Sequence, residues 1–325
     1  MDTGLYNTST LKYEHISKAT DNILTYIDER RRGISESLQT RWKKYNDMCM
    51  GGIEPNTIYV IAGISGSGKS SFVNSLESDL FDLNPGANFV ILNFTFEMIS
   101  SRQVGRKLSY KLNKTTSELY SGIRGKVLDE KDYFKAQEYA EEIKKQRIFY
   151  VDVPGSVQEV RNTIVHFQEH EAKGKWLVVI LDHALLTKGR SGDKEREILA
   201  DLQYMFMEIK KFGKNTIIEL SQLNRDIESV DRITNNFMHY PMRKDIFGSE
   251  AIYQSADYLM VLHRPELLGI KDYGPYNLPT QNLIYLHLLK NREGGVGLII
   301  FENNLKHNRM DEYDLKKDND QSNLF

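Results

Sequence analysis

The stretch that decides the fold is Thr57-Ile-Tyr-Val-Ile-Ala62 followed by Gly63-Ile-Ser-Gly-Ser-Gly-Lys-Ser70. The first half is a short, β-branched apolar run that predicts a buried strand, and the second half fits the phosphate-loop pattern G-x-x-x-x-G-K-[ST]. The glycines let backbone N–H groups point inward at phosphate oxygens, and a helix starting here adds its positive N-terminal end. We therefore expect the loop to bind ATP or another nucleoside triphosphate.

Two side chains of the loop have distinct expected roles. Lys69 supplies a point charge for the β- and γ-phosphates, and the Ser70 hydroxyl is placed to ligate Mg²⁺. The residues expected to contact the nucleotide are Gly63, Ser65, Gly66, Ser67, Gly68, Lys69, Ser70 and Ser71.

Outward from the loop, short apolar runs alternate with helical patterns, which predicts parallel strands covered on both faces. Strands are expected at 57–62, 88–94, 148–152, 176–181 and 216–220. Helices are expected at 70–80, 130–146, 156–171 and 195–212, the third opening with a Ser156/Glu159 capping box. Further runs lie at 258–263, 283–290 and 297–302, and the last two flank Gly294-Gly295, which predicts a hairpin.

Three of these strands end beside polar side chains suited to phosphate chemistry. Asp182 ends the run 176–181, expected beside the P-loop strand, where a carboxylate holds the Mg²⁺ shell. Glu97 follows the second strand and is suited to orienting the attacking water or accepting its proton. Gln222 follows the fifth strand, and an amide that donates and accepts suits sensing of a γ-phosphate.

Lys290 and Arg292 lie on one face of a strand next to the Gly-Gly turn. Two interpretations are open for this pair of cations. They form a solvated edge, or they reach the γ-phosphate of a site on a neighbouring subunit.

These motifs together resemble the C-terminal, RecA-like motor domain of DnaB-type replicative helicases. The resemblance spans roughly 41–302, in the family's motif order. The residues that carry it are Ser65-Gly-Ser-Gly-Lys-Ser70, Phe96-Glu97-Met98, Asp182, Ser221-Gln-Leu-Asn-Arg225 and Lys290-x-Arg292-x-Gly294. It implies an α/β fold with a mainly parallel central sheet, a C-terminal β-hairpin and an N-terminal docking helix.

The resemblance also implies a function. The family's motor is a hexameric ring that hydrolyses NTP, with Mg²⁺, between subunits and moves 5′→3′ along single-stranded DNA. By position, Glu97 would be the catalytic carboxylate and Gln222 the γ-phosphate sensor. Lys290 and Arg292 would act in trans, with Arg292 as the arginine finger. Primase and a helicase loader are the further partners that the resemblance suggests.

The segment from Asp245 to Asp257 resembles the family's DNA-contacting region, with two departures in the chain. His183 stands where the family usually has tyrosine, and we expect it to be a packed core histidine. Phe247 stands where an arginine is common, and it either stacks on a base or packs internally. The expected DNA contacts are Arg243, Lys244, Phe247, Gly248 and Ser249, with Arg232 a further candidate; the charged ones are alternatively a solvated face.

The polar first 40 residues are expected to form a helical arm, ahead of a motor at 41–302 and a flexible polar tail at 303–325. A narrow apolar stripe marks the arm helix, which docks on a neighbouring subunit or packs on its own domain. The stripe consists of Ile16, Ala19, Ile23, Leu24 and Ile27. The family's primase-receiving N-terminal domain is not visible in the sequence, which suggests a compact viral or mobile-element version.

Composition narrows the remaining possibilities. The net charge is −2, so any nucleic-acid contact must come from a local basic surface. A single cysteine, Cys49, excludes a disulfide framework and a Cys-rich zinc site. No apolar run is long enough for a membrane helix, so we expect a cytoplasmic protein of a bacterial or phage-infected cell.

Two rival functions remain open at the level of sequence. A RecA-type recombination ATPase shares the P-loop and the strand-tip glutamate, although Lys290 and Arg292 favour the helicase. A nucleotide-switched loader or scaffold would bind ATP without unwinding DNA, although Glu97 and Arg292 favour turnover.

Overall fold

The computed structural model describes residues 13–34, 37–182, 184, 187 and 194–314. Its contacts divide the chain into two units, Met1–Ser37 and Leu38–Phe325. The first unit contains α1 (Ile16–Arg31), whose last turn carries Arg30 and Arg31. Gly33 follows it in the left-handed region at φ 67°. None of the residues of α1 is buried within this unit.

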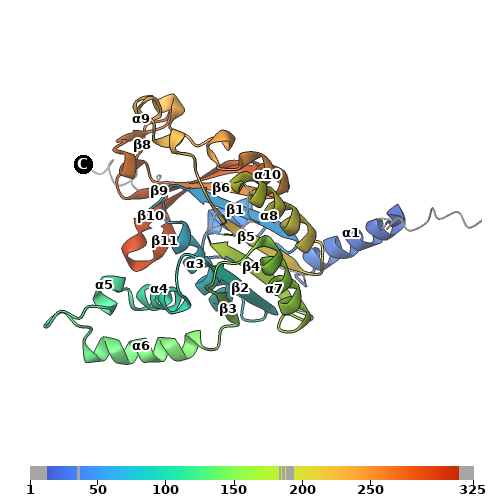
Figure 1. The fold of residues 1–325 in the computed structure, drawn as a ribbon, viewed down its shortest axis with the longest axis horizontal. Helices are drawn as coiled ribbons and strands as arrows, with labels where there is room; N and C mark the ends of the chain where they lie inside the picture. The colour runs from blue at the N-terminus through green and yellow to red at the C-terminus, as the bar shows by residue number, and fades with distance from the viewer. Residues whose placement is uncertain (1–12, 35–36, 183, 185–186, 188–193, 315–325) are drawn as a thin grey trace, which may run out of the picture. The chain divides into compact units, whose positions relative to one another are not determined.

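The second unit is built on a nine-stranded sheet, in the order β11-β10-β9-β6-β1-β5-β4-β2-β3 (Figure 1). The strands from β6 to β3 in that order run parallel to one another, and β9, β10 and β11 are added antiparallel at one edge. The strands are β1 (Thr57–Gly63), β2 (Phe89–Thr95), β3 (Ile148–Val151), β4 (Trp176–Asp182), β5 (Asn215–Gln222), β6 (Tyr258–His263), β9 (Leu283–Asn291), β10 (Gly297–Asn304) and β11 (Arg309–Glu312). A separate two-stranded sheet pairs β7 (Asp272–Tyr273) with β8 (Leu278–Pro279).

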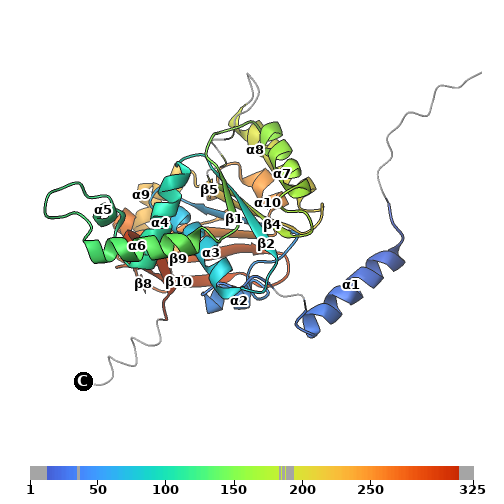
Figure 2. The same ribbon diagram turned by 90° about the horizontal axis from the view of Figure 1, so that it is seen from below.

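Helices cover both faces of the sheet, which explains why its central strands are apolar along their whole length. One face packs against α7 (Val157–Glu169), α8 (Glu195–Ile209) and α10 (Ser249–Ser255). The other face packs against α2 (Lys43–Met48) and α3 (Lys69–Leu83). The remaining helices are α4 (Ser100–Leu112), α5 (Thr116–Leu119), α6 (Glu130–Ile143) and α9 (Val230–Thr234). Figure 2 shows α4 and α6 lying together beside α3.

Each predicted strand and helix of the motor is present, and the Ser156/Glu159 capping box opens α7 as expected. The hairpin also forms, with Gly297 opposite Leu288 in the β9–β10 pairing. One prediction about strand neighbours was wrong. The Asp182 strand β4 does not lie beside the P-loop strand β1, because β5 pairs with both and separates them.

The structure also corrects the predicted flexible tail at 303–325. Within its described part, β10 continues to Asn304 and β11 pairs with it, so the polar segment forms a sheet edge. Met310 is completely buried, and its carbonyl accepts a hydrogen bond from Trp42 Nε1 at 2.9 Å. The Glu312 carboxylate accepts from the backbone N–H groups of Lys44 and Tyr45, both at 3.0 Å. The C-terminal strand therefore binds α2, and the sheet extends ten residues beyond the predicted end at Glu302.

Across the described residues, no helix combines the length and the apolar character that crossing a membrane requires.

Candidate nucleotide site and DNA-facing segment

The predicted site residues meet at the carboxyl edge of the parallel strands. Gly63 at the end of β1 is in register with Gln222 of β5, and Thr95 at the end of β2 is in register with Asp182 of β4. Ligands of open α/β sheets bind at this edge, because the loops that follow the strands converge there.

Local backbone chemistry shapes the P-loop between β1 and α3. Gly66 and Gly68 have φ values of 75° and 102°, a region that glycine enters without steric cost. A Cβ on Gly68 would meet the side chains of Met310 and Leu305, so the C-terminal segment packs closely over the loop at this point. α3 begins at Lys69, whose ammonium donates to the carbonyls of Gly63 at 2.7 Å and Ile64 at 3.0 Å.

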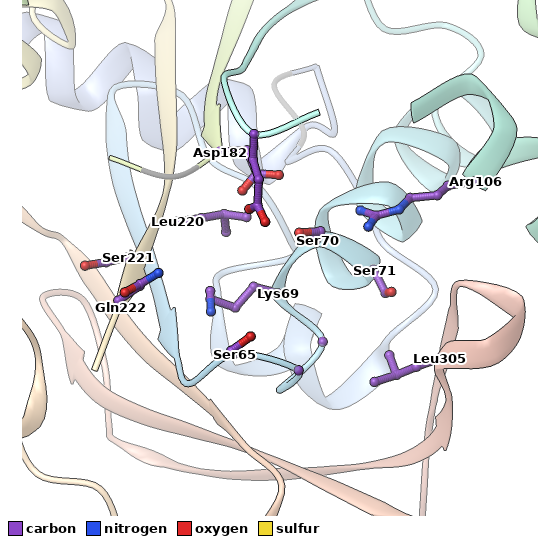
Figure 3. A pocket seen from close by; sticks show the side chains of 13 residues that line it. Ser65, Lys69, Ser70, Ser71, Arg106, Asp182, Leu220, Ser221, Gln222 and Leu305 are labelled. Atoms are coloured by element: carbon purple, nitrogen blue, oxygen red, sulfur yellow. The ribbon is translucent and has the colours of Figure 1, made fainter. Parts of the chain in front are cut away.

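A cavity of about 270 Å³ opens over this loop. Figure 3 shows Lys69 and Asp182 facing the same space, with the Arg106 guanidinium directed toward Ser70. The residues that line the cavity are Ser65, Gly66, Gly68, Lys69, Ser70, Ser71, Glu97, Arg106, Asp182, Leu220, Ser221, Gln222 and Leu305. Most of the predicted P-loop residues and all three strand-tip residues are therefore brought together. Gly63 and Ser67 are not among the lining residues, and the Ser67 side chain is buried beneath the loop.

The electrostatics of the cavity suit a polyphosphate. Burial lowers the pKa of Lys69, and the nearby carboxylates of Asp182 and Glu97 partly oppose this effect. A desolvated cation next to acceptors gains more from an incoming anion than an exposed one, because the local dielectric is low.

Arg106 on α4 is a site residue that the sequence analysis missed. Burial lowers its pKa, while Asp182 and Glu97 act in the opposite direction. Its Nη1 is buried and has no hydrogen-bond partner among the described residues. Buried guanidinium nitrogens are rarely left unbonded, so this nitrogen identifies a place for an anionic oxygen.

A buried ion pair fixes the helix that carries Arg106. Lys107 Nζ lies 2.7 Å from Glu77 Oε2 on α3, and both side chains are at most 2% exposed. Asn93 and Tyr150 also donate to the Glu77 carboxylate, at 2.5 and 3.1 Å. Removing one partner of such a pair is strongly destabilising, so α4 is held in a defined position against the P-loop helix.

The C-terminal segment completes the wall of the cavity. Leu305 lines it from η6 (Leu305–His307), and Asn308 Nδ2 donates to Ser109 Oγ of α4 at 3.0 Å. The segment expected to be a flexible tail therefore joins the P-loop to the helix of Arg106.

The predicted DNA-facing segment follows β5 as a closed loop. Its two ends are joined by the Leu223–Ile246 bridge, and Phe247 N donates to the carbonyl of Gln222 at 3.1 Å. Asn224 Nδ2 donates to the carbonyl of Lys244 at 3.0 Å. The expected γ-phosphate sensor and the expected DNA contacts are therefore joined through the backbone.

The cations of this segment differ in accessibility. Lys244 is exposed, and Arg243 forms a 2.8 Å ion pair with Glu250 while its side chain stays 43% exposed. Arg232 is instead 4% exposed and bonds the Asp245 carboxylate through both Nη1 and Nη2, at 2.9 Å each. The suggestion that Arg232 contacts phosphate was therefore wrong, because its charge is already satisfied inside the protein.

The remaining predicted DNA contacts lie at the start of α10. Phe247 is half-buried and packs against the core, which favours the packing interpretation over base stacking. Gly248 caps the helix at φ 67°, and Ser249 is the first residue of α10. His183 falls outside the described residues, so the expectation for it stays a prediction.

Lys290 and Arg292 do not line the nucleotide cavity of their own chain. The Lys290 ammonium donates to the Tyr253 carbonyl and lies 4.7 Å from the centre of that ring. Arg292 Nε forms a 2.8 Å ion pair with Asp257, although the arginine side chain is 46% exposed.

The cavity fits a nucleotide with Mg²⁺. Ser70 and Asp182 both line the cavity and offer two oxygen ligands, and Mg²⁺ usually takes one or two protein ligands and keeps water and phosphate oxygens. Arg106 also lines the cavity, and its unbonded nitrogen agrees with an anion there.

Comparison with known proteins identifies a family and similar folds. The family described as "DnaB-like helicase C terminal domain" matches residues 37–312. A solved structure described as an ATPase domain is 18% identical with a TM-score of 0.76, over 93% of this chain and 100% of that one. A second, "The Structure Of A DnaB-Like Replicative Helicase And Its Interactions With Primase", is 19% identical with a TM-score of 0.72, over 92% of this chain and 67% of that one. No curated protein matches the chain. The predicted α/β, RecA-like fold class is confirmed.

Proposed function

The chain belongs to the DnaB-like helicase C-terminal domain family, and from this premise we propose that it is the ATP-driven motor of a hexameric 5′→3′ replicative DNA helicase. Each active site would form between two subunits, and the ring would move along single-stranded DNA. By the same resemblance, primase and a loader would be its partners, in the cytoplasm of a bacterial or phage-infected cell.

The observation that carries the proposal is the distance along the sheet between the nucleotide cavity and the cations Lys290 and Arg292. The P-loop, Asp182, Glu97 and Gln222 line one cavity of the chain. Lys290 and Arg292 lie on and beyond β9, which is separated from β4 by β6, β1 and β5. In the proposed ring, this second set meets the γ-phosphate held by the next subunit. Charge that develops on the transferring phosphoryl group is then stabilised from both sides.

Within one subunit, each residue has a proposed task. Lys69 and Arg106 bind the β- and γ-phosphates, and Gln222 senses the γ-phosphate. Ser70 and Asp182 hold Mg²⁺, which when bound neutralises phosphate charge. Glu97 orients the attacking water and takes its proton. Glu97 is exposed and lies between Thr95 and Met98, where Thr95 Oγ1 donates to the Met98 carbonyl at 2.9 Å. This hydrogen bond holds the backbone on both sides of Glu97, whose side chain lines the cavity.

The proposed DNA contacts are Arg243, Lys244 and the backbone around Gly248 and Ser249. Arg243 and Lys244 lie in the closed loop that begins after Gln222, and Gly248 and Ser249 follow it. A movement of Gln222 at the γ-phosphate would therefore move the DNA-facing segment through the end of β5. The α1 stripe is proposed to dock on a neighbouring subunit, because an isolated amphipathic helix of this length is marginally stable in water.

Mixing of two inactive variants tests the interface site. Lys69→Ala protein should bind nucleotide only weakly but keeps Arg292, whereas Arg292→Ala protein keeps its ATP cavity. Each alone should lose most of its ATPase activity, since a finger contributes about 10³–10⁵ in rate. Mixed rings contain interfaces with both residues intact, so the ATPase rate should rise above both parents. If it stays at the parental level although labelled subunits exchange, the trans site is excluded and a nucleotide-switched scaffold becomes the better function.

A further inference from the structure

We propose that Asp257 is the positioning residue for Arg292: it orients the guanidinium so that one edge stays free for a phosphate on the neighbouring subunit. This inference rests on the proposed interface site. It concerns a carboxylate at the start of β6, outside the nucleotide cavity.

Asp257 holds Arg292 through both side chain and main chain. Its Oδ1 lies 2.8 Å from Arg292 Nε, and its carbonyl accepts from the Arg292 backbone N–H at 3.1 Å. The Gln254 carbonyl accepts from Arg292 Nη2 at 2.8 Å. None of the contacts of the described residues uses Nη1, so that edge of the planar group is left for another acceptor.

The ion pair is suited to hold a fixed geometry. Asp257 is 12% exposed, and its Oδ2 also accepts from the buried Ile58 N–H at 2.8 Å, which ties the carboxylate to β1. A guanidinium is planar and rigid, so fixing Nε and Nη2 also fixes the direction of Nη1. Orientation before the reaction lowers the barrier, and small misplacements of a catalytic group have large effects on rate.

A β-bulge directs this part of β9 toward Asp257. Leu259 pairs with Lys290 and the next residue, Met260, pairs with Leu288, so Leu289 is the extra residue. Bulges re-aim the side chains that follow them. The cations after this bulge lie against Tyr253 and Asp257.

Lys210 gives the Asp257 carboxylate a second positively charged partner besides Arg292. Its Nζ lies 3.0 and 2.7 Å from the two carboxylate oxygens, from the C-terminal end of α8. When the Arg292 guanidinium also contacts a phosphate, Lys210 remains as a counterion of Asp257. The nearly buried carboxylate is therefore never left without a cation, a state that costs several kcal/mol.

The test replaces the carboxylate with its closest neutral analogue. Asp257→Asn keeps an oxygen for the Ile58 N–H but loses the charge that holds Arg292. We expect the kcat for ATP to fall roughly 10- to 100-fold with an unchanged KM, because the nucleotide cavity is untouched. Arg161→Met is the control, since it removes a cation from an ion pair with Glu208 of α8 that includes neither Asp257 nor Arg292, and it should leave kcat near the wild-type value.

Subunit mixing separates a positioning role from a structural one. Adding Lys69→Ala protein to Asp257→Asn protein should raise the ATPase rate above that of Asp257→Asn alone. The reason is that Asp257→Asn damages only the arginine that a subunit supplies to its neighbour, and the Lys69→Ala subunit supplies an intact one. Adding Arg292→Ala protein should give no rise, since every finger is then damaged.

The outcomes distinguish the two proposals. If Lys69→Ala complements Arg292→Ala but not Asp257→Asn, or if Arg161→Met reproduces the loss, the role of Asp257 is overturned while the interface site stands. If Lys69→Ala protein raises the activity of neither Arg292→Ala nor Asp257→Asn protein, the proposed interface site is wrong. The positioning role of Asp257 is then wrong as well. If Asp257→Asn protein fails to bind nucleotide, Asp257→Glu protein replaces it in the test. The longer side chain moves the carboxylate away from its position beside Arg292, and the same complementation is expected.

Discussion

Two clusters of positively charged side chains, one beside the P-loop and one at the end of β9, differ in how their hydrogen bonds are satisfied. At the carboxyl edge of the parallel strands, Arg106 has a buried nitrogen without a partner in the described chain, and Lys69 donates only to loop carbonyls there. At the end of β9, Lys290 and Arg292 are bonded to Tyr253, Gln254 and Asp257. The first cluster is open to an anion from solution, whereas the second is already bonded within the chain, as the proposed interface role requires.

The strongest test of this contrast is Lys69→Ala. Losing a charged hydrogen-bond donor costs about 3 kcal/mol, which corresponds to an approximately 100-fold weaker affinity for the nucleotide. Arg292→Ala should leave the affinity of dilute, dissociated protein unchanged, because this arginine is outside the cavity of its own chain. Titration with a fluorescent ATP analogue measures both variants. Equal losses of affinity would contradict the distinction between the clusters.

A smaller effect is expected for Arg106→Met, which keeps the length of the side chain and removes its charge. Affinity for the triphosphate should fall roughly 10-fold, since one charge-assisted hydrogen bond contributes about 1.5 kcal/mol. Arg102→Met is the matched control on the same helix, because Arg102 is exposed and lies over Tyr120, 4.4 Å from its ring centre. Calorimetric titration of both variants checks the prediction. A similar loss in the control would assign the effect to α4 stability instead of phosphate binding.

The smallest effect on nucleotide affinity is expected at Glu219, a fully buried carboxyl group on β5 that neither cluster uses. Burial raises its pKa from 4.5 to about 7, partly opposed by a 2.8 Å hydrogen bond from Gln203. The folded state therefore binds a proton that the unfolded state releases above pH 4.5, so this group's contribution to stability is lost as the pH rises toward 7 and beyond.

Glu219→Gln should remove this pH dependence without changing nucleotide affinity. The free energy of unfolding of the variant minus that of the wild type should increase by about 2–3 kcal/mol between pH 5 and pH 8. Burial lowers the pKa of His263 and His287 to about 3, which makes stability fall below pH 6.5, but both proteins share that effect and it cancels. Urea unfolding across this range gives the difference. A constant difference would mean that Glu219 titrates normally.

Hydrophobic pattern predicted the strands well and failed for α4. The parallel strands are buried on both faces, so each appears as an uninterrupted apolar run. The buried residues of α4 are Gln103, Gly105, Lys107 and Ser109, which leave no apolar stripe to detect. Periodicity therefore had no signal for the helix that carries Arg106, because its inner face is held by polar contacts to residues far along the chain.

The polar segment after Glu302 failed as a prediction for a related reason. Composition indicates flexibility where few apolar residues are available, yet a single buried methionine, Met310, and pairing with β10 give this segment a fixed place. An edge strand obtains its backbone hydrogen bonds from a neighbour, and neither local propensity nor composition reports that neighbour.

Local backbone rules that a few adjacent residues satisfy were enough to predict the phosphate loop, the strand ends at Asp182 and Gln222 and the helix start at Ser156. The positions of Arg106 facing the cavity, of Leu305 closing it and of Asp257 holding Arg292 became evident only in the folded chain. These contacts depend on burial and on partners distant in the chain, and desolvation acts on a charged group only once the whole sheet has assembled around it.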